Sequence, residues 1–269
     1  MSILNVMQRT PWINSTVKTL RLHHCIDFIL ARWPLRKTTP HGCRYCIHTV
    51  AGLIVANEIF GTDVYVDAVR LANPKTFVDL GANVGYFPLL VADLTGSKSI
   101  CGLVVEPNPG LIPAINSHIQ INGLANVRTI QAAVTTAGQV GHIDFFINPS
   151  NIASSVSGEF NPLIVAGTGI QKISVATVDI NLAWEEHFPN EPVVDLLKID
   201  IEGAEMDFLQ GNPEFMARVG AVLIEWHKWI CTFDQISLLL HDYGFSLRHV
   251  AYEDIHAGTA YFEKPAHEV

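Results

Sequence analysis

The sequence has no run of lysine or arginine, and its 26 acidic side chains outnumber the 17 basic ones, which leaves a net charge of −9. This balance argues against nucleic acid or an anionic membrane surface as a partner. No apolar stretch is long enough to span a membrane, and residues 1–9 lack the cationic-then-apolar order of a signal peptide. The five cysteines are odd in number and irregularly spaced, so we predict no disulfide framework and a reducing, cytoplasmic environment.

The 269 residues are 49% apolar and 16% charged, which indicates a globular chain of one domain with a modest extension. Apolar residues recur at roughly helical spacing over 12–35, and a strand followed by a helix is predicted over 43–60. These features predict an N-terminal helical and strand cap over residues 1–60, followed by the main domain over 61–269.

From residue 76 onward, predicted strands alternate with predicted helices, which is typical of a mostly parallel sheet. A closing pair of strands predicts one antiparallel strand in this sheet. We therefore expect an α/β, doubly wound fold. Residues 149–170 are rich in Ser, Gly, Asn and Pro and are predicted to form a long, functional loop. The strands are expected at 77–80, 102–107, 127–134, 173–178, 194–200, 219–226, 245–252 and 259–263, with 142–148 as an added edge strand.

The stretch 76–85 reads as a short buried strand, a glycine turn and the start of an apolar helix, the order that opens a nucleotide-binding α/β sheet. Asp79 puts a carboxylate near the end of the strand, where it would repel a pyrophosphate and attract an ammonium or a sulfonium. Asn83 stands where a dinucleotide site needs a glycine. The turn therefore favours S-adenosylmethionine over NAD, although an NAD-dependent oxidoreductase remains an alternative.

Glu106 ends the second predicted strand, 27 residues after Asp79. A carboxylate at this point can accept hydrogen bonds from both ribose hydroxyls of a nucleoside. The alternative is a surface acid that precedes Pro107. The pairing with Asp79 favours the ligand-binding interpretation.

Acidic side chains follow the strand at 194–200. Asp200 and Glu202 are two apart, so in extended chain they share a face and point into the crevice above the sheet. The alternative is that these acids complement the dipole of the following helix. We prefer that alternative for Glu205 and a functional role for Asp200.

The strand at 219–226 ends in Glu225, Trp226 and His227, with Glu225 and His227 on one face. A carboxylate beside a histidine raises its basicity, so His227 is a candidate general base. Asp200 is expected next to it, because consecutive strands of this kind usually lie side by side. Asp200, Glu225 and His227 are also a possible set of ligands for a divalent metal.

Cys43 and Cys46, flanked by His41 and His48, suggest a zinc site at first sight. A single pair at this spacing is weak evidence, and no second cysteine pair completes the site. In a strand the two thiols would also point to opposite faces. We interpret these cysteines as structural.

The motifs at 77–87, 105–109, 197–205 and 224–227 together resemble the FkbM-type S-adenosylmethionine-dependent methyltransferases over roughly residues 50–230. The specific part is Asp-Ile-Glu-Gly-Ala-Glu at 200–205, and 176–179 is similar to another family segment. The resemblance implies a class I, Rossmann-like fold with a seven-stranded sheet. It also implies methylation of a hydroxyl on a small molecule such as a polyketide, a sugar or another product of secondary metabolism.

The resemblance then implies roles for individual residues. The methionine part of the cofactor is expected to lie against the glycine turn. The ribose is expected to contact Glu106 and its neighbours, and the adenine is expected to lie near Ala133. The base is either His227 with Glu225, or Asp200 with Glu202; a divalent metal is possible. Asn151, Ser155 and the cap are expected to border the acceptor. A catalytically silent S-adenosylmethionine-binding protein and a homo-oligomer are also compatible. The predicted cofactor residues are Asp79, Gly81, Ala82, Asn83, Gly85, Tyr86, Glu106, Pro107, Asn108, Ala133 and Asp200.

Overall fold

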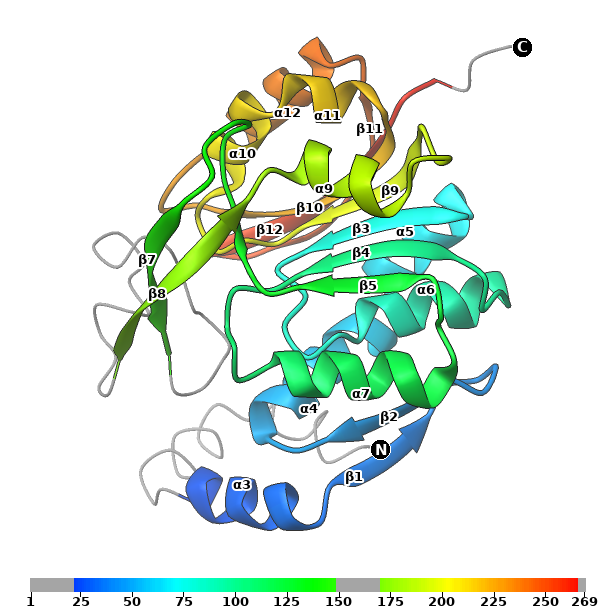
Figure 1. The fold of residues 1–269 in the computed structure, drawn as a ribbon, viewed down its shortest axis with the longest axis vertical. Coiled ribbons are helices and arrows are strands. Elements are labelled where there is room, and N and C mark those ends of the chain that lie inside the picture. The colour runs from blue at the N-terminus through cyan, green and yellow to red at the C-terminus, as the bar shows by residue number, and fades with distance from the viewer. Residues whose placement is uncertain (1–21, 149–169, 266–269) are drawn as a thin grey trace.

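A seven-stranded sheet lies at the centre of the computed structural model, which describes residues 22–148 and 170–265 (Figure 1). The strand order is β11-β12-β10-β9-β3-β4-β5, and β12 alone runs antiparallel to its neighbours. The predicted doubly wound sheet with one antiparallel strand is therefore confirmed. The strands are β3 (Thr76–Leu80), β4 (Cys101–Val105), β5 (Val127–Ile130), β9 (Val194–Ile199), β10 (Val219–His227), β11 (Ser246–Glu253) and β12 (Ala257–Glu263).

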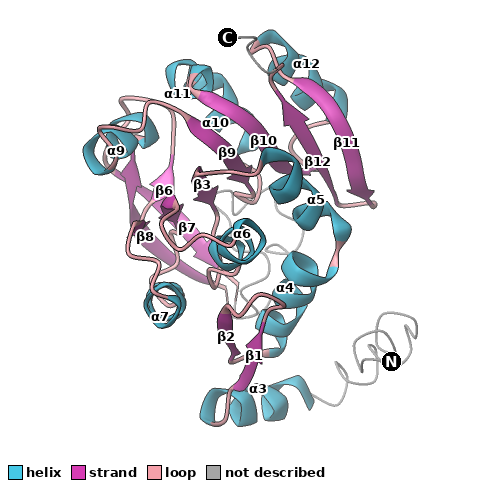
Figure 2. Ribbon diagram, turned by 90° about the vertical axis from the view of Figure 1, so that its right-hand side faces the viewer, coloured by secondary structure: helices cyan, strands magenta, loops and turns pink. Residues whose placement is uncertain are grey.

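Helices cover both faces of this sheet (Figure 2). The alternation of side chains along β3 explains the two layers, because Phe77 packs into one apolar cluster and Val78 and Leu80 pack into the other. The Phe77 cluster holds α4 (Val50–Gly61), α5 (Asp63–Ala72), α6 (Phe87–Thr95) and α7 (Ile112–Asn122). The opposite cluster holds α9 (Ile180–His187), α10 (Glu205–Gly211), α11 (Pro213–Ala217) and α12 (Phe233–Asp242).

A second, three-stranded sheet with the order β6-β8-β7 stands beside the main one. Its strands are β6 (Ala133–Val134), β7 (His142–Ile147) and β8 (Gln171–Val178). Three expectations are wrong here. The stretch 127–134 is not one strand, since β5 ends at Ile130, and neither 142–148 nor 173–178 lies in the main sheet. The physical reason is that alternation along a strand fixes which side chains face the core but not which strand lies next to it.

The described part of the N-terminal region begins with α3 (Leu22–Arg32), continues through a hairpin of β1 (Leu35–Thr38) and β2 (Arg44–Ile47), and ends in α4. The predicted helical stretch over 12–35 meets β1 only at Leu35, and the strand β1 itself was not predicted. The backbone of Cys46 holds this region to the rest: its N–H donates to His118 Nε2 at 3.0 Å, and Tyr86 donates to its carbonyl at 2.9 Å. The boundary at residue 60 stays a prediction. In the described segments no helix has the length and apolarity to cross a bilayer.

Candidate active site

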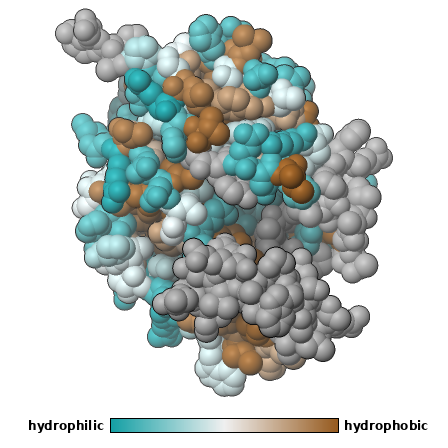
Figure 3. All heavy atoms as spheres, turned by 180° about the vertical axis from the view of Figure 1, so that it is seen from behind, coloured by the Kyte–Doolittle hydropathy of each residue, from teal (hydrophilic) through white to brown (hydrophobic). Residues whose placement is uncertain are grey.

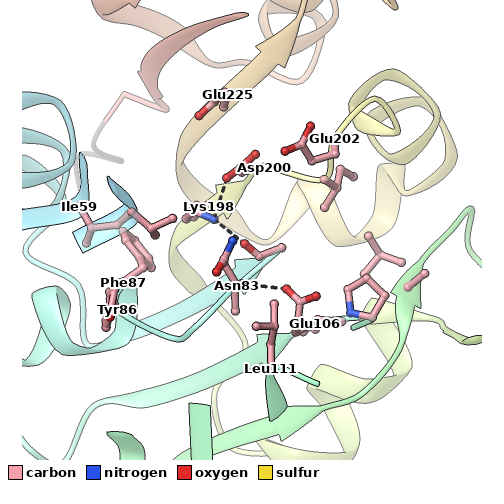
Figure 4. A pocket seen from close by; sticks show the side chains of 18 of the residues that line it. Ile59, Asn83, Tyr86, Phe87, Glu106, Leu111, Lys198, Asp200, Glu202 and Glu225 are labelled. Atoms are coloured by element: carbon pink, nitrogen blue, oxygen red, sulfur yellow. Dashed lines mark hydrogen bonds and ion pairs between the residues drawn. The ribbon is translucent and has the colours of Figure 1, made fainter. Parts of the chain in front are cut away.

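A pocket opens at the carboxyl ends of β3, β4, β9 and β10, where ligands bind in sheets of this kind (Figure 4). Two of its sides differ in chemistry. We call one the glycine wall, which comprises Gly81, Ala82, Asn83, Glu106 and Pro107. We call the other the acid wall, which comprises Glu58, Asp200, Glu202 and Glu225. Helix α4, the start of α7, the segment around Ala133 and β7 complete the lining with apolar side chains, among them Ile54, Val55, Ile59, Leu111, Ala132, Val134 and Phe145.

The turn after β3 has a backbone that requires glycine. Gly81 has a φ of +74°, and a Cβ built on it would lie 1.7 Å from the carbonyl oxygen of Asp200. Gly85 does not line the pocket, but its Cβ would lie 3.1 Å from the Cα of Ile115, where α7 passes. Asn83 also adopts a left-handed conformation, with a φ of 51°, which asparagine tolerates better than most residues. The turn therefore packs closely against the backbone of Asp200 and against α7.

Glu106 is fixed by two backbone donors. Its Oε2 accepts from the N–H of Asn83 and its Oε1 from the N–H of Asn108, both at 2.8 Å. Burial raises the pKa of this carboxyl to about 7, although the two N–H groups lower it. Each carboxylate oxygen keeps a second lone pair for a further donor. Asn108 thus supports Glu106 from outside the pocket lining.

Asp79 does not reach the pocket, so the expectation that it faces the ligand is wrong. Its side chain is fully buried, and Lys198 Nζ lies 3.1 Å from its Oδ1. The register explains this contact, because Asp79 stands opposite Lys198 on the neighbouring strand β9. Leu80, one residue later, ends β3, so the side chain of Asp79 lies inside the sheet layer and not beyond its edge.

Lys198 is a residue of the site that sequence reasoning missed. Its ammonium lies 3.0 Å from the carbonyl of Gly81 and 3.6 Å from Asp200, and so touches both walls. Burial alone would lower the pKa of Lys198, but Asp79 and Asp200 raise it above its ordinary value. A lone lysine in the apolar stretch 194–199 was the available signal, since a buried lysine needs a buried acid.

The acid wall gathers carboxylates from three elements. Glu58 comes from α4, Glu225 from β10, and Asp200 follows β9. Burial raises the pKa of Glu58 and of Glu225, and the charge of Asp200 raises both further. Tyr65 donates to Glu58 at 3.0 Å. No local pattern in the sequence marked Glu58, because its place in the site depends on how α4 packs.

His227 lies between two carboxylates behind the acid wall. Its Nδ1 is 2.8 Å from Glu205 Oε1, and its Nε2 is 3.3 Å from Glu202 Oε2. Burial would lower the pKa of His227, but Glu205, Glu202 and Glu225 raise it to about 10. The geometry therefore favours the protonated ring, with Glu205 as its direct partner. The pocket lining formed by the described residues includes Glu202 and does not include His227.

The partner predicted for His227 is wrong. Glu225 Oε1 lies 4.0 Å from Nε2, beyond a hydrogen bond, whereas Glu205 holds Nδ1. Glu205 is the first residue of α10, as the helix-dipole interpretation expects, but it is fully buried and also accepts from the N–H of Gly203 at 3.0 Å. Glu202 adopts a left-handed φ of 52°, so the chain turns sharply between the two acids.

The possible metal ligands also differ from the predicted set. Asp200, Glu202 and His227 offer ligand atoms that all lie within 4.8 Å of one another, so Glu202 replaces Glu225. Two carboxylates and one imidazole suit a divalent ion, provided that the imidazole loses its proton.

The remaining predicted residues are distributed as follows. Ala133 and Tyr86 line the pocket, and Tyr86 also anchors the N-terminal region through Cys46. Asn151 and Ser155, predicted to contact the acceptor, lie outside the described residues.

Comparison with known proteins bears on the family of this chain. The model of the methyltransferase FkbM domain matches residues 79–247. Methyltransferase sdnD of Sordaria araneosa is 26% identical over 76% of this chain and 85% of its own length. Methyltransferase 1 of Beauveria bassiana is 24% identical over 72% of this chain and 80% of its own.

Among solved structures, methyltransferase FkbM from Methylobacillus flagellatus is 15% identical with a TM-score of 0.44. The match covers 71% of this chain and 44% of that one, so this chain spans less than half of that protein. The family model covers the glycine turn, Glu106 and every residue from Asp200 to His227 that this site uses. The chain belongs to the FkbM family of methyltransferases.

Proposed function

We propose that the protein transfers a methyl group from S-adenosylmethionine to a hydroxyl of a small molecule. The observation that carries this proposal is that one pocket combines the glycine wall with the acid wall. The first suits a nucleoside, and the second can accept a proton. Membership of a methyltransferase family supports the same reaction.

The pocket fits the cofactor at several points. Glu106 is a buried carboxylate with lone pairs left for ribose hydroxyls, and the apolar side chains of Leu111, Ala132 and Phe145 suit an adenine ring. Gly81, Ala82 and Asn83 line the pocket where β3 ends, and we place the methionine part against them. When bound, S-adenosylmethionine supplies a methyl group already activated by its sulfonium.

We assign the proton-accepting role to Glu202, with Asp200 beside it. A hydroxyl is a weak nucleophile until its proton leaves, and Glu202 lines the pocket. Burial raises the pKa of Glu202 to about 8, although His227 lowers it, so its carboxylate is a stronger base than an exposed one. His227 is held behind it as a cation and positions the carboxylate. This choice favours the Asp200–Glu202 pair over His227 as the base.

The acceptor that best suits this pocket carries several hydroxyls on an apolar frame. The carboxylates of the acid wall accept hydrogen bonds from hydroxyls, while Ile54, Val55 and Ile59 of α4 provide apolar contact. Polyketides and glycosides of secondary metabolism have this character. The free thiols of all five cysteines favour a cytoplasmic setting.

The test is a methyl-transfer assay with a panel of hydroxylated polyketides and glycosides, combined with calorimetric titration. We expect S-adenosylhomocysteine to bind and NADH not to bind. Glu202→Gln should lower kcat by about 10²–10⁴-fold with unchanged affinity for S-adenosylhomocysteine. Glu214→Gln, an exposed acid on α11, is the matched control and should leave both values unchanged.

Three outcomes would contradict the proposal. If NADH binds and S-adenosylhomocysteine does not, the oxidoreductase alternative holds. If the cofactor binds but no acceptor is methylated, the protein is a silent binder. Undiminished kcat in Glu202→Gln would remove Glu202 from the proton transfer. Loss of activity with a chelator would assign a metal to Asp200, Glu202 and His227.

A further inference from the structure

The outward side of α3 is apolar. Its inward side is fixed by Leu30, which is buried, and by Asp27, whose Oδ1 accepts from the N–H of Val50 at 2.7 Å. The helix therefore turns Phe28 and Ile29 outward, with 76% and 52% of their surface exposed. A helix on the surface of a globular protein ordinarily turns charged side chains out. This helix does the opposite.

The exposed apolar side chains continue past the end of α3. Trp33 is 69% exposed and Leu35, at the start of β1, is 39% exposed. Of the fourteen large apolar side chains exposed in the described segments, five fall within residues 26–35. Figure 3 shows apolar residues at the bottom of that view. A concentration of this kind marks an interaction surface. We call it the N-terminal face, comprising Ile26, Phe28, Ile29, Trp33 and Leu35 with Arg32, Arg36 and Lys37.

The charge at this face is positive although the chain is acidic. Residues 1–48 hold 7 of the 17 basic side chains and only 1 of the 26 acidic ones, Asp27. The carboxylate of Asp27 is turned inward to the N-terminus of α4. Arg32, Arg36 and Lys37 are all exposed next to the apolar side chains. The net charge of −9, which predicted no attraction to an anionic membrane, therefore does not describe this end of the molecule.

We propose that the N-terminal face docks the protein on the surface of an anionic lipid bilayer. Phe28, Ile29 and Trp33 would enter the boundary between headgroups and acyl chains, where tryptophan is favoured because its ring is amphipathic. Arg32, Arg36 and Lys37 would contact lipid phosphates at the same depth. Apolar area and positive charge on one surface are the two contributions that peripheral membrane binding needs.

Docking in this way would place the pocket near the bilayer. Helix α3 packs on α4, whose Ile54 is 41% exposed and also lines the pocket. The helix that carries most of the docking surface therefore packs directly on a helix that lines the pocket. The docking proposal does not depend on the methyl-transfer proposal, because it rests on side chains outside the pocket.

The experiment is co-sedimentation of the full chain with vesicles of phosphatidylcholine, with and without about 30% phosphatidylserine. We expect the protein to bind the anionic vesicles. Binding should be about tenfold weaker on vesicles of phosphatidylcholine alone, and also about tenfold weaker on the anionic vesicles at about 0.5 M salt. Phe28→Ser/Trp33→Ser should lower vesicle binding by about tenfold or more. Arg32→Gln/Arg36→Gln/Lys37→Gln should remove the preference for phosphatidylserine.

The matched control is Leu71→Ser/Leu238→Ser, which removes two apolar side chains that are 61% and 65% exposed elsewhere. It should bind vesicles as the wild type does. Three results would overturn the proposal. The first is that the wild type binds neither kind of vesicle, and the second is that the face variant and the control variant lose vesicle binding equally. The third is that the wild type binds no vesicle but is a dimer in sedimentation velocity, which Phe28→Ser/Trp33→Ser converts to a monomer. The last result would make the face a contact between copies of the chain.

Discussion

The glycine wall and the acid wall meet in one pocket but are built by different means. The glycine wall depends on backbone: a turn without room for a Cβ at Gly81, and two N–H groups that hold Glu106. Its residues lie within 27 positions of one another. The acid wall depends on side chains, which reach the pocket from α4, β10 and the segment after β9. Local backbone geometry therefore fixes the glycine wall, whereas the packing of distant elements fixes the acid wall.

The two walls therefore respond differently to substitution. The glycine wall forms only if the backbone adopts its turn, so a single substitution in the turn lowers both the stability of the fold and the affinity for the cofactor. A site of converging carboxylates remains folded when one charge is removed, because like charges raise each other's free energy. Lys198 belongs to both, since it contacts Asp79, Gly81 and Asp200.

We expect the largest effect from Gly81→Ala. The new Cβ would lie 1.7 Å from the carbonyl oxygen of Asp200, so β3 and β9 would have to separate where the walls meet. We predict a loss of about 3 kcal/mol or more in the free energy of unfolding and no measurable binding of S-adenosylhomocysteine. Urea denaturation and calorimetric titration measure the two quantities.

Gly96→Ala is the control for this prediction. Gly96 has a similar φ of +65°, but nothing lies within 4 Å of its Cβ position. It should lose only about 1 kcal/mol, the cost of left-handed backbone at a residue with a side chain. Equal losses in the two variants would show that backbone strain alone, without the contact at Asp200, explains the effect.

A loss of stability of similar size, without the change in the turn at Gly81, is expected from Lys198→Met, which leaves Asp79 buried without a cation. Removing one partner of a buried ion pair costs about 3–5 kcal/mol, so the variant should unfold at much lower urea concentration. Lys172→Met breaks an exposed pair with Asp144 at 2.7 Å and should cost less than about 1 kcal/mol. The double variant Lys198→Met/Asp79→Leu should recover most of the loss. No recovery would mean that Lys198 acts mainly through Asp200.

The contrast between the walls also explains which parts of the site were predictable from the sequence. The turn at Gly81 and the place of Glu106 follow from residues close in the chain, and both lie at the pocket as expected. Lys198 opposite Asp79 and Glu205 beside His227 are pairings between elements, fixed by strand register and by the turn at Glu202. The fold shows the same limit. Alternation identified the strand at 142–148 but could not assign it to the smaller sheet.

Glu106→Gln should weaken cofactor binding without a large loss of stability. The carboxylate accepts from two N–H groups, and the amide of glutamine would turn a donor toward one of them. We predict that the Kd for S-adenosylhomocysteine rises about 10–100-fold. Calorimetric titration measures this change, with the exposed Glu214→Gln as control. An unchanged Kd would show that the ribose is held elsewhere.

The smallest change, in the slope of Tm against pH, is expected from Glu205→Gln, and it tests how the acid wall is charged. The pKa of His227 is raised from 6.5 to about 10, so its proton stabilises the folded state fully below pH 6.5 and progressively less as the pH rises to about 10. Removing the charge of Glu205 lowers this pKa, so the decline of Tm across that range should become shallower in the variant.

The measurement is Tm at intervals from pH 6 to pH 10, with Glu214→Gln as the control. Glu106 also titrates in this range, but it is present in all three proteins and cancels in the difference between curves. The charge of Glu205 also raises the pKa of Glu202, so all three proteins carry Glu202→Gln in this measurement. Parallel curves with and without Glu205→Gln would mean that Glu205 does not hold the proton on His227. A shallower curve would show that His227 is a cation in the folded protein because of Glu205. The free imidazole needed for a general base would then be absent at neutral pH, which leaves the proton transfer to the carboxylates of the acid wall.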